Sequence, residues 1–212
     1  MDSAVEHEKD KLMPSDPFDV YRTPEWFEGL AWQHRWIEFM VGWWCGTFGK
    51  PKTMIDYGSG DGWWSHSFKQ IGTETCFAVE LDDIAFEHTP KDVYFKQHDL
   101  REPLLDLDGK FDLVICLEVA EHLPKNAAHN ALLDTLARST GNLLMFSAAQ
   151  PGQPGTGHIN PQPVSYWIEA IEKRAYIKLS QERTAAARIA LERIVPAGLD
   201  FLPRNLLIFA KV

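Results

Sequence analysis

The stretch Met54-Ile-Asp-Tyr-Gly-Ser-Gly-Asp-Gly-Trp64 decides the fold. A short apolar run, typical of a strand, meets three glycines at alternate positions, and a helix-forming segment follows. Glycine adopts positive φ and carries no Cβ, so Gly58, Gly60 and Gly62 allow a sharp turn and let a ligand approach the main chain closely. The stretch therefore predicts a strand, a tight turn and a helix start, with backbone N–H groups turned towards a ligand.

That ligand is not expected to be a polyphosphate. The spacing G-x-G-x-G differs from the G-x-G-x-x-G of nicotinamide enzymes and from the G-x-x-x-x-G-K-[ST] of phosphate loops, and no lysine follows the last glycine. Asp56 and Asp61 would repel phosphates and would suit a ligand that carries positive charge. An ordinary glycine-rich turn is the alternative that this stretch alone leaves open.

Composition limits the class of protein. A chain of 212 residues with 45% hydrophobic content suits one sizeable core, and a formal charge of -9 disfavours wide contact with nucleic acid. The three cysteines lie far apart without a C-x-x-C pattern, which favours a reducing compartment. No run approaches the ~20 apolar residues that a membrane span needs. We expect a cytoplasmic protein without membrane contact, either a monomer or a homodimer.

The N-terminal quarter divides into two parts. Residues 1–20 mix charges with prolines and predict a mobile arm. Residues 21–50 are rich in tryptophan, and Trp32, Trp36, Phe39 and Trp43 follow one another at helical spacing, which predicts a single aromatic face. This face either packs permanently on the rest of the protein or forms a lid over a ligand. We assign 21–50 as a lid and 51–212 as the main domain.

The rest of the chain alternates strand and helix patterns. Predicted strands follow at 76–79, 93–96, 111–117, 143–146 and 206–212, and predicted helices at 63–71, 126–140, 163–175 and 182–194. This alternation favours an α/β fold with a parallel, doubly wound sheet covered on both faces. Ligands bind such sheets outside the carboxyl ends of the strands. Glu80, Asp99 and Glu118 each follow a strand, as does the loop 151–157, so they should share one edge with the glycine loop.

Two of these acids suggest a nucleoside. Glu80 lies 22 residues after Gly58 at the end of the second strand, where a carboxylate can accept hydrogen bonds from both ribose hydroxyls. Asp99 is placed to accept from an exocyclic amine such as that of adenine. Each acid alone could be a solvated strand end, but their joint placement favours an adenosine ligand without a phosphate chain.

These motifs, together with Phe111-Asp-Leu-Val-Ile-Cys-Leu-Glu-Val-Ala-Glu-His-Leu123, resemble those of class I S-adenosylmethionine-dependent methyltransferases. The segment Leu117 to Leu123 is most similar to the branch that includes quinone-biosynthesis and other small-molecule methyltransferases. The resemblance covers about residues 50–150. It implies a Rossmann-like α/β/α sandwich with seven strands, the last of them antiparallel and supplied by Leu206 to Val212, and S-adenosyl-L-methionine as cofactor.

The resemblance also implies residue roles. The glycine loop would wrap the methionine portion of the cofactor, Glu80 would hold the ribose, Asp99 with Leu100 would face the adenine, and Glu118 would lie beside the methyl group. The predicted cofactor-binding residues are Asp56, Gly58, Ser59, Gly60, Glu80, Leu81, Asp99, Leu100 and Glu118. The predicted acceptor-binding residues are Tyr21, Trp26, Trp32 and Asn160.

Methyl transfer to oxygen or nitrogen requires alignment above all, so a base is optional. If the acceptor is a hydroxyl, His158 in the polar run after the 151–157 loop and His122 after the fourth strand are the predicted catalytic bases. A structural, helix-capping role for His122 is equally compatible with the sequence. The other histidines show no metal-ligand spacing, and we expect no metal.

Three rival functions remain. A DNA amino-methyltransferase would carry an Asn/Asp-Pro-Pro-aromatic motif where this chain has Glu118 to Glu121, and a protein acceptor is also less favoured than a small molecule. A non-catalytic protein that binds S-adenosylmethionine and a partner is the third, although the intact glycine loop counts against it. The sequence leaves the identity of the acceptor open.

Overall fold

The computed structural model describes residues 23–81, 83–103, 109–174, 177–196 and 200–212. The arm predicted at 1–20 and the predicted acceptor residue Tyr21 therefore lie outside the described residues.

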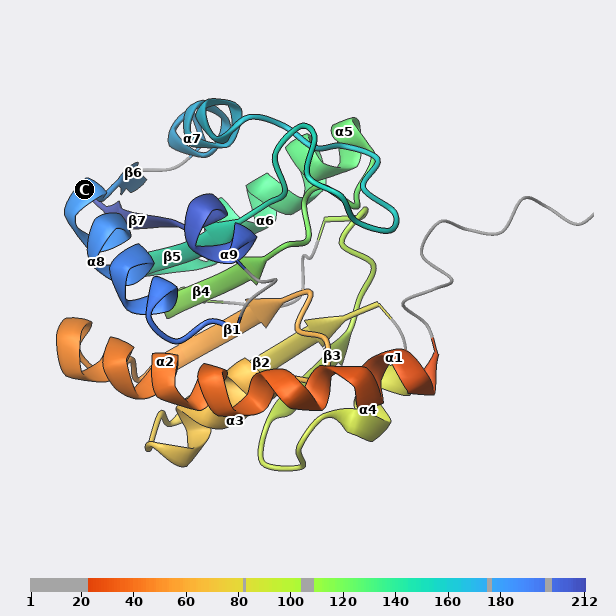
Figure 1. The fold of residues 1–212 in the computed structure, drawn as a ribbon, viewed down its shortest axis with the longest axis vertical. Coiled ribbons are helices and arrows are strands. Elements are labelled where there is room, and N and C mark those ends of the chain that lie inside the picture. The colour runs from red at the N-terminus through yellow and green to blue at the C-terminus, as the bar shows by residue number, and fades with distance from the viewer. Residues whose placement is uncertain (1–22, 82, 104–108, 175–176, 197–199) are drawn as a thin grey trace, which may run out of the picture.

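A seven-stranded sheet forms the centre of the molecule (Figure 1). Its order is β3-β2-β1-β4-β5-β7-β6, and β7 runs antiparallel to both of its neighbours while β1 to β5 are parallel. The predicted mostly parallel sheet with an antiparallel C-terminal strand is confirmed. The strands are β1 (Thr53–Tyr57), β2 (Thr75–Glu80), β3 (Tyr94–Gln97), β4 (Phe111–Leu117), β5 (Thr140–Ser147), β6 (Ile177–Leu179) and β7 (Leu207–Lys211).

Helices cover both faces of this sheet (Figure 1). Those of the 34–70 and 181–205 regions pack on one face, and those of the 125–172 region pack on the other. The helices are α1 (Pro24–Glu28), the 3₁₀ helix η2 (Gly29–Gln33), α2 (His34–Phe48), α3 (Trp63–Gln70), α4 (Asp83–His88), α5 (Lys125–Ala127), the π-helical turn η3 (Ala128–Leu132), α6 (Leu133–Ser139), α7 (Val164–Glu172), α8 (Gln181–Glu192) and α9 (Phe201–Asn205).

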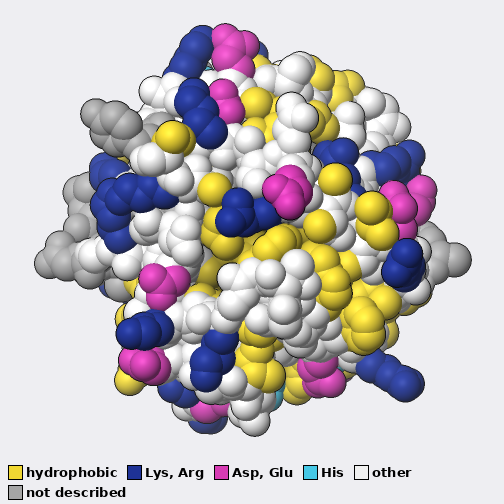
Figure 2. Space-filling view, turned by 90° about the vertical axis from the view of Figure 1, so that its left-hand side faces the viewer, with side chains coloured by type: hydrophobic (Ala, Val, Ile, Leu, Met, Phe, Trp, Pro, Cys, Tyr) yellow, Lys and Arg dark blue, Asp and Glu magenta, His cyan; other side chains and the backbone are white. Residues whose placement is uncertain are grey.

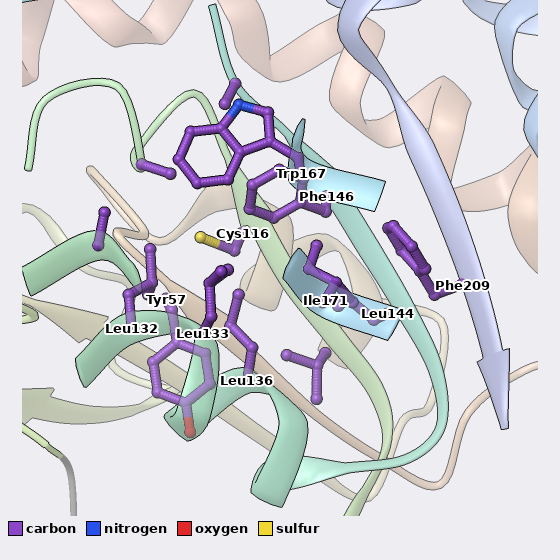
Figure 3. Packing of buried hydrophobic residues seen from close by; sticks show 14 of the residues in the cluster. Tyr57, Cys116, Leu132, Leu133, Leu136, Leu144, Phe146, Trp167, Ile171 and Phe209 are labelled. Carbon is purple, nitrogen blue, oxygen red and sulfur yellow. The ribbon is translucent and has the colours of Figure 1, made fainter. Parts of the chain in front are cut away.

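The strands are apolar on both sides because both sides are covered. Along β4, Leu113 and Ile115 join the core under α2, α3 and α8, whereas Val114 and Cys116 point into the core under α6 and α7. Figure 3 shows the second of these cores, where Trp167 of α7 lies over Phe146 and Cys116. This packing fixes the carboxyl ends of β1, β2 and β4, where the predicted site residues lie.

The predicted aromatic face is wrong. Trp32 and Phe39 are 52% and 55% exposed. The buried face of α2 consists instead of Trp36, Ile37, Met40, Val41 and Trp44. The 3₁₀ turn η2 places Trp32 outside α2, so that residue does not share the periodicity of the helix that follows.

Other boundaries differ in detail. The helix expected to begin at Asn126 starts one residue earlier, after Pro124, and it ends at Ser139, so Gly141 already belongs to β5. The short elements α4, β6 and α9 were not predicted.

The surface mixes charges with apolar side chains. On the face shown in Figure 2, basic side chains are separated by acidic and uncharged ones and form no continuous stripe, and hydrophobic side chains lie between them. Within the described residues no helix is both long and apolar enough to cross a membrane.

Candidate cofactor and acceptor site

The glycine loop between β1 and α3 has the predicted conformation. Gly58, Gly60 and Gly62 all have positive φ, between 56° and 75°. A Cβ on Gly58 would lie 2.4 Å from Cγ2 of Val119. The loop thus turns in a way that only glycine tolerates, and it packs directly against the segment after β4.

A cavity of about 230 Å³ opens beside this loop. It is lined by the glycine loop and Asp56, by Trp26, Leu30 and Gln33 of the N-terminal segment, and by Phe201 and Leu202 of α9. Asp56, Asp61 and Glu118 are its charged lining residues, and no lysine or arginine occurs among the described residues that line it. The cavity thus favours a positively charged ligand over a phosphate.

Asp56 is the most strongly affected acid of this cavity. It is buried to 2% exposure at the end of β1. Burial raises the pKa of Asp56 well above its usual range, and the nearby carboxylates of Glu80 and Asp61 raise it further. A cationic group placed in the cavity would relieve this repulsion.

Glu80 lies at the end of β2, as predicted, and supports the loop. Its carboxylate accepts hydrogen bonds from the backbone N–H of Gly60 at 3.0 Å and from that of Leu81 at 2.7 Å. The contact with Gly60 ties the end of β2 to the glycine loop. Glu80 does not line the cavity, so its contact with a ribose remains a prediction.

Asp99 follows β3, but its carboxylate is already engaged. Arg101 donates to both of its oxygens, through Nε at 2.8–2.9 Å and Nη2 at 2.6 Å. Although partial burial opposes it, this pairing lowers the pKa of Asp99. Neither Asp99 nor Leu100 lines the cavity, so their contact with an adenine remains a prediction.

An unpredicted contact ties the N-terminal segment to the loop. Nε2 of His34 lies 2.6 Å from Oδ2 of Asp61, and the His34 ring stacks on Trp63 with centroids 3.6 Å apart. Asp61 also accepts from the N–H of Trp63 at 3.2 Å, at the start of α3. The loop acid therefore joins α2 to α3.

Glu118 closes the cavity on the β4 side. Among the described residues it is the non-glycine residue with positive φ, 54°. Its carboxylate accepts from Nδ2 of Asn205 at 3.2–3.3 Å, a contact from the C-terminal end of α9 that no sequence motif indicated. Burial raises the pKa of Glu118, although hydrogen bonds from Ser147 and Asn205 oppose that shift.

Beyond Glu118, the structure brings together Glu121, His122 and His158. Their possible ligand atoms all lie within 4.8 Å of one another, and the two imidazole rings meet edge to face. Nδ1 of His122 lies 3.2 Å from the carbonyl of Gly157, so it carries the proton. Burial lowers the pKa of His122 to about 4, with His158 adding to the effect. Sequence reasoning selected both histidines but missed Glu121.

The remaining predicted acceptor residues differ in placement. Trp26 lines the cavity, whereas the exposed Trp32 does not. Asn160 is buried: its Nδ2 donates to the carbonyl of Ala120, and its Oδ1 accepts from Gln162. These contacts favour a structural role for Asn160, which fastens the loop after Gly157 to the end of β4.

A family model described as a methyltransferase domain matches residues 28–174. The chain belongs to this methyltransferase family. The match covers the glycine loop, the strand-end acids and the histidine cluster. The fold confirms the class I S-adenosylmethionine-dependent type that the sequence motifs resembled.

Individual relatives are distant. Methyltransferase str3 of Strobilurus tenacellus is 32% identical over 77 residues, which are 36% of this chain and 28% of that protein. The match thus spans little more than a quarter of the relative.

Among solved structures, magnesium protoporphyrin IX methyltransferase from Synechocystis PCC 6803, with bound SAH, has a TM-score of 0.62 at 17% identity and covers 85% of this chain and 84% of its own. The SAM-bound amino pentose methyltransferase CalS10 from Micromonospora echinaspora has a TM-score of 0.64 at 14% identity, with coverages of 97% and 100%. Both show that the methyltransferase fold is shared.

Proposed function

We propose that this protein transfers a methyl group from S-adenosylmethionine to an oxygen or nitrogen of a small molecule. The observation that carries the proposal is the cavity at the glycine loop, whose charged lining residues are Asp56, Asp61 and Glu118. A sulfonium and an ammonium both carry positive charge, and these acids suit them.

The residues present fit this cofactor. Oγ of Ser59 is buried and has no hydrogen-bond partner among the described residues, so a ligand in the loop could satisfy it. Glu80 would accept from the ribose hydroxyls, and Leu81, Asp99 and Leu100 would flank the base. When bound, the cofactor supplies an electrophilic methyl group.

The chain's own contribution is then alignment and exclusion of water. Trp26, Trp36 and Trp64 line the cavity next to the glycine loop, and aromatic walls suit a flat or apolar acceptor. The solved neighbours are, by name, a magnesium protoporphyrin IX methyltransferase and an amino pentose methyltransferase, so a small-molecule acceptor is compatible with this fold. A cytoplasmic location and a monomeric or homodimeric state are part of the same proposal.

For a hydroxyl acceptor, His158 is the better of the two proposed bases. With a pKa of about 4, His122 is a weak proton acceptor near neutral pH, and it already donates to the carbonyl of Gly157. His158 lies in a segment without helix or strand, where Nδ1 has no hydrogen-bond partner among the described residues.

Two other functions are less well supported. A protein that binds S-adenosylmethionine without catalysis is disfavoured by the intact glycine loop, in which Gly58, Gly60 and Gly62 keep the positive φ of a ligand-binding turn. A nucleic-acid methyltransferase would be expected to present a basic surface, which neither the net charge of -9 nor the face in Figure 2 provides.

Replacing Glu80 tests the cofactor site. If Glu80 accepts both ribose hydroxyls, Glu80→Ala removes charge-assisted hydrogen bonds worth roughly 1.5–3 kcal/mol, or about ten- to hundredfold in affinity. Isothermal titration calorimetry with S-adenosylhomocysteine measures this loss. Glu80→Gln retains one amide oxygen as an acceptor for the N–H of Gly60, so it separates ribose binding from loop support. The exposed Glu74→Ala is the control, and unchanged affinity in a folded Glu80 variant would place the ribose elsewhere.

A further inference from the structure

A second cavity, of about 370 Å³, opens away from the glycine loop. Its charged lining residues are four basic side chains and one acid, namely Lys110, Arg138, Arg174, Lys211 and Asp134. The whole chain carries 21 basic and 30 acidic residues, so a lining in which bases outnumber acids runs against the composition. This basic pocket is opposite in charge to the cofactor cavity, whose charged lining residues are acids.

The basic pocket lies at the edge of the sheet opposite to the glycine loop. Thr140 and Ile177, which also line it, are the first residues of β5 and β6, and Lys110 immediately precedes β4. Lys211 is the last residue of the antiparallel β7 and pairs with Ile177. The pocket thus lies at the amino ends of β4 and β5, whereas the glycine loop follows the carboxyl end of β1, which runs parallel to them (Figure 1). A ligand in the pocket would be separated from the cofactor by the length of the strands.

Arg174 is held in the pocket by three hydrogen bonds. Its Nε donates to Oδ1 of Asp134 at 2.7 Å, and Nη1 and Nη2 donate to the carbonyls of Ala170 and His129 at 2.8 and 2.6 Å. A guanidinium has five N–H donors, so these bonds leave two donors for a ligand. Because the side chain is already ordered, a ligand would bind it at little further cost in rotamer entropy.

The two lysines of the pocket supply charge that no described acid balances. Both are exposed, and neither Nζ makes a hydrogen bond or ion pair in the part of the chain that the structure describes. Asp134 is the one acid among the described lining residues, and it already pairs with Arg174. Positive charges that line one pocket repel one another, and an anion between them would relieve that repulsion.

From this arrangement we infer that the basic pocket binds a small phosphorylated compound, either a phosphate monoester or a diphosphate. The planar fork of an arginine matches the oxygens of a phosphate group, and lysines add point charges. The volume lies within the range of roughly 300–1,000 Å³ that small-molecule sites occupy, and Ala137 with the buried Ile177 offers an apolar surface to the organic part. The inference is independent of the proposed function, because the acids of the cofactor cavity would repel such a ligand.

A nucleic acid fits this pocket less well. Proteins bind single strands with aromatic side chains on which the bases stack, along a basic groove that follows the backbone. No aromatic side chain occurs among the lining residues that the structure describes, and the basic residues gather in one pocket. A compact, multiply charged phosphate compound therefore fits better than a polymer.

Isothermal titration calorimetry of the full chain in a phosphate-free buffer tests the site. The probes are pyrophosphate and glucose 6-phosphate, and glucose is the uncharged control. We expect at least one of the two phosphate compounds to bind with one molecule per chain, and its affinity to fall as NaCl is added, because salt screens exposed charges. The tighter of the two probes distinguishes a diphosphate site from a monoester site, and glucose should not bind.

Two variants remove positive charge from the pocket. Arg138→Gln and the double variant Lys110→Gln/Lys211→Gln should each weaken phosphate binding by about tenfold or more, because hydrogen bonds to charged groups are lost. Lys173→Gln is the matched control: it removes a positive charge next to Arg174 in sequence, but Lys173 pairs with Glu169 and does not line the pocket. This control should bind as tightly as the wild type.

Affinity for S-adenosylhomocysteine should be unchanged in all three variants, which reports on folding and separately on the cofactor site. The inference fails if neither phosphate compound binds to the wild-type chain, or if both pocket variants retain wild-type affinity. It also fails if a single-stranded oligonucleotide binds in preference to pyrophosphate and loses affinity in the same variants, since the pocket would then belong to a nucleic-acid surface.

Discussion

At the scale of single residues, Gly58 in the glycine loop is required both for its backbone conformation and for its close contact with Val119. Gly58 combines a φ of 75° with the side chain of Val119 at a distance that leaves no space for a methyl group. Two independent requirements therefore act on one residue: backbone freedom, and close approach of the segment that leads to Glu118 and Glu121.

Gly58→Ala should destabilise the protein by roughly 2–4 kcal/mol, because left-handed backbone costs about 1–2 kcal/mol and overpacking about 1–3 kcal/mol. Urea denaturation measures this change. Gly42→Ala is the control: Gly42 lies inside α2 with nothing within 4 Å of its added Cβ, so alanine should stabilise by about 0.5–1 kcal/mol. Equal effects of the two substitutions would contradict the clash with Val119.

Asp56 carries a second prediction at this scale. The pKa of Asp56 in the folded state is raised above the unfolded value of about 3.9. The protonated carboxyl therefore favours the folded state at pH values below the unfolded pKa, and this contribution to the free energy of unfolding is lost as pH rises through the folded pKa. Asp56→Asn removes the charge at nearly constant shape. Its urea midpoint without cofactor should exceed that of the wild type by an amount that grows from pH 5 to pH 8, while affinity for S-adenosylhomocysteine falls. The exposed Glu74→Gln serves as control, and a difference independent of pH would argue against a charge effect.

At the scale of elements, the sequence predicted best where burial is most uniform. The strand 111–117 was predicted with its observed bounds, because an apolar run covered on both faces has a clear beginning and end. The three-residue β6 lacks such a run, since only Ile177 is buried in it. The aromatic face was wrong for two reasons. A 3₁₀ turn separates Trp32 from α2, and within α2 the buried face is set by aliphatic residues such as Ile37, Met40 and Val41, which leaves Phe39 exposed.

In the candidate site too, some residues could be predicted from local sequence patterns and others could not. Residues at strand ends, such as Glu80 and Glu118, could be predicted from topology. Leu30 over Gly60 and Asn205 at Glu118 could not, because each contact joins segments far apart in the chain. Glu121 was missed for a similar reason: its surroundings form only when the loop to Asn160 folds back.

The N-terminal lid, predicted for 21–50, can now be narrowed. Trp26 of α1 and Leu30 of η2 lie next to Gly60, whereas α2 is part of the core. We expect hydrogen exchange in residues 24–33 to slow when S-adenosylhomocysteine binds, because the lid closes over the ligand. Exchange in the core-facing part of α2 should stay slow in both states and serves as the internal control. Slow exchange in 24–33 without ligand, unchanged on binding, would show a permanently packed segment.

At the scale of the whole molecule, α2 and the sheet share one core. Met40 and Val41 are fully buried in the cluster that also contains Met54, Leu113 and Ile208 from three strands. Helix α2 therefore cannot separate from the sheet without exposing that cluster, although it precedes the segment first assigned as the main domain. We propose that residues from 34 onwards unfold as one cooperative unit.

Met40→Ala tests whether α2 unfolds together with the sheet, and Phe39→Ala at the neighbouring position is the control. Truncating a fully buried methionine typically costs about 2–5 kcal/mol, and the whole transition should move to lower urea concentration, with tryptophan fluorescence and far-ultraviolet circular dichroism still coincident. Phe39→Ala removes a larger side chain from the same helix, but that side chain is 55% exposed, so its effect should stay within about 0.5 kcal/mol. If α2 belonged to a separate cap, Met40→Ala would produce an early transition in one probe and leave the main midpoint unchanged. Coincident curves at a lower midpoint would instead mean that the helix before the glycine loop helps to hold the sheet, and with it the cofactor site, in place.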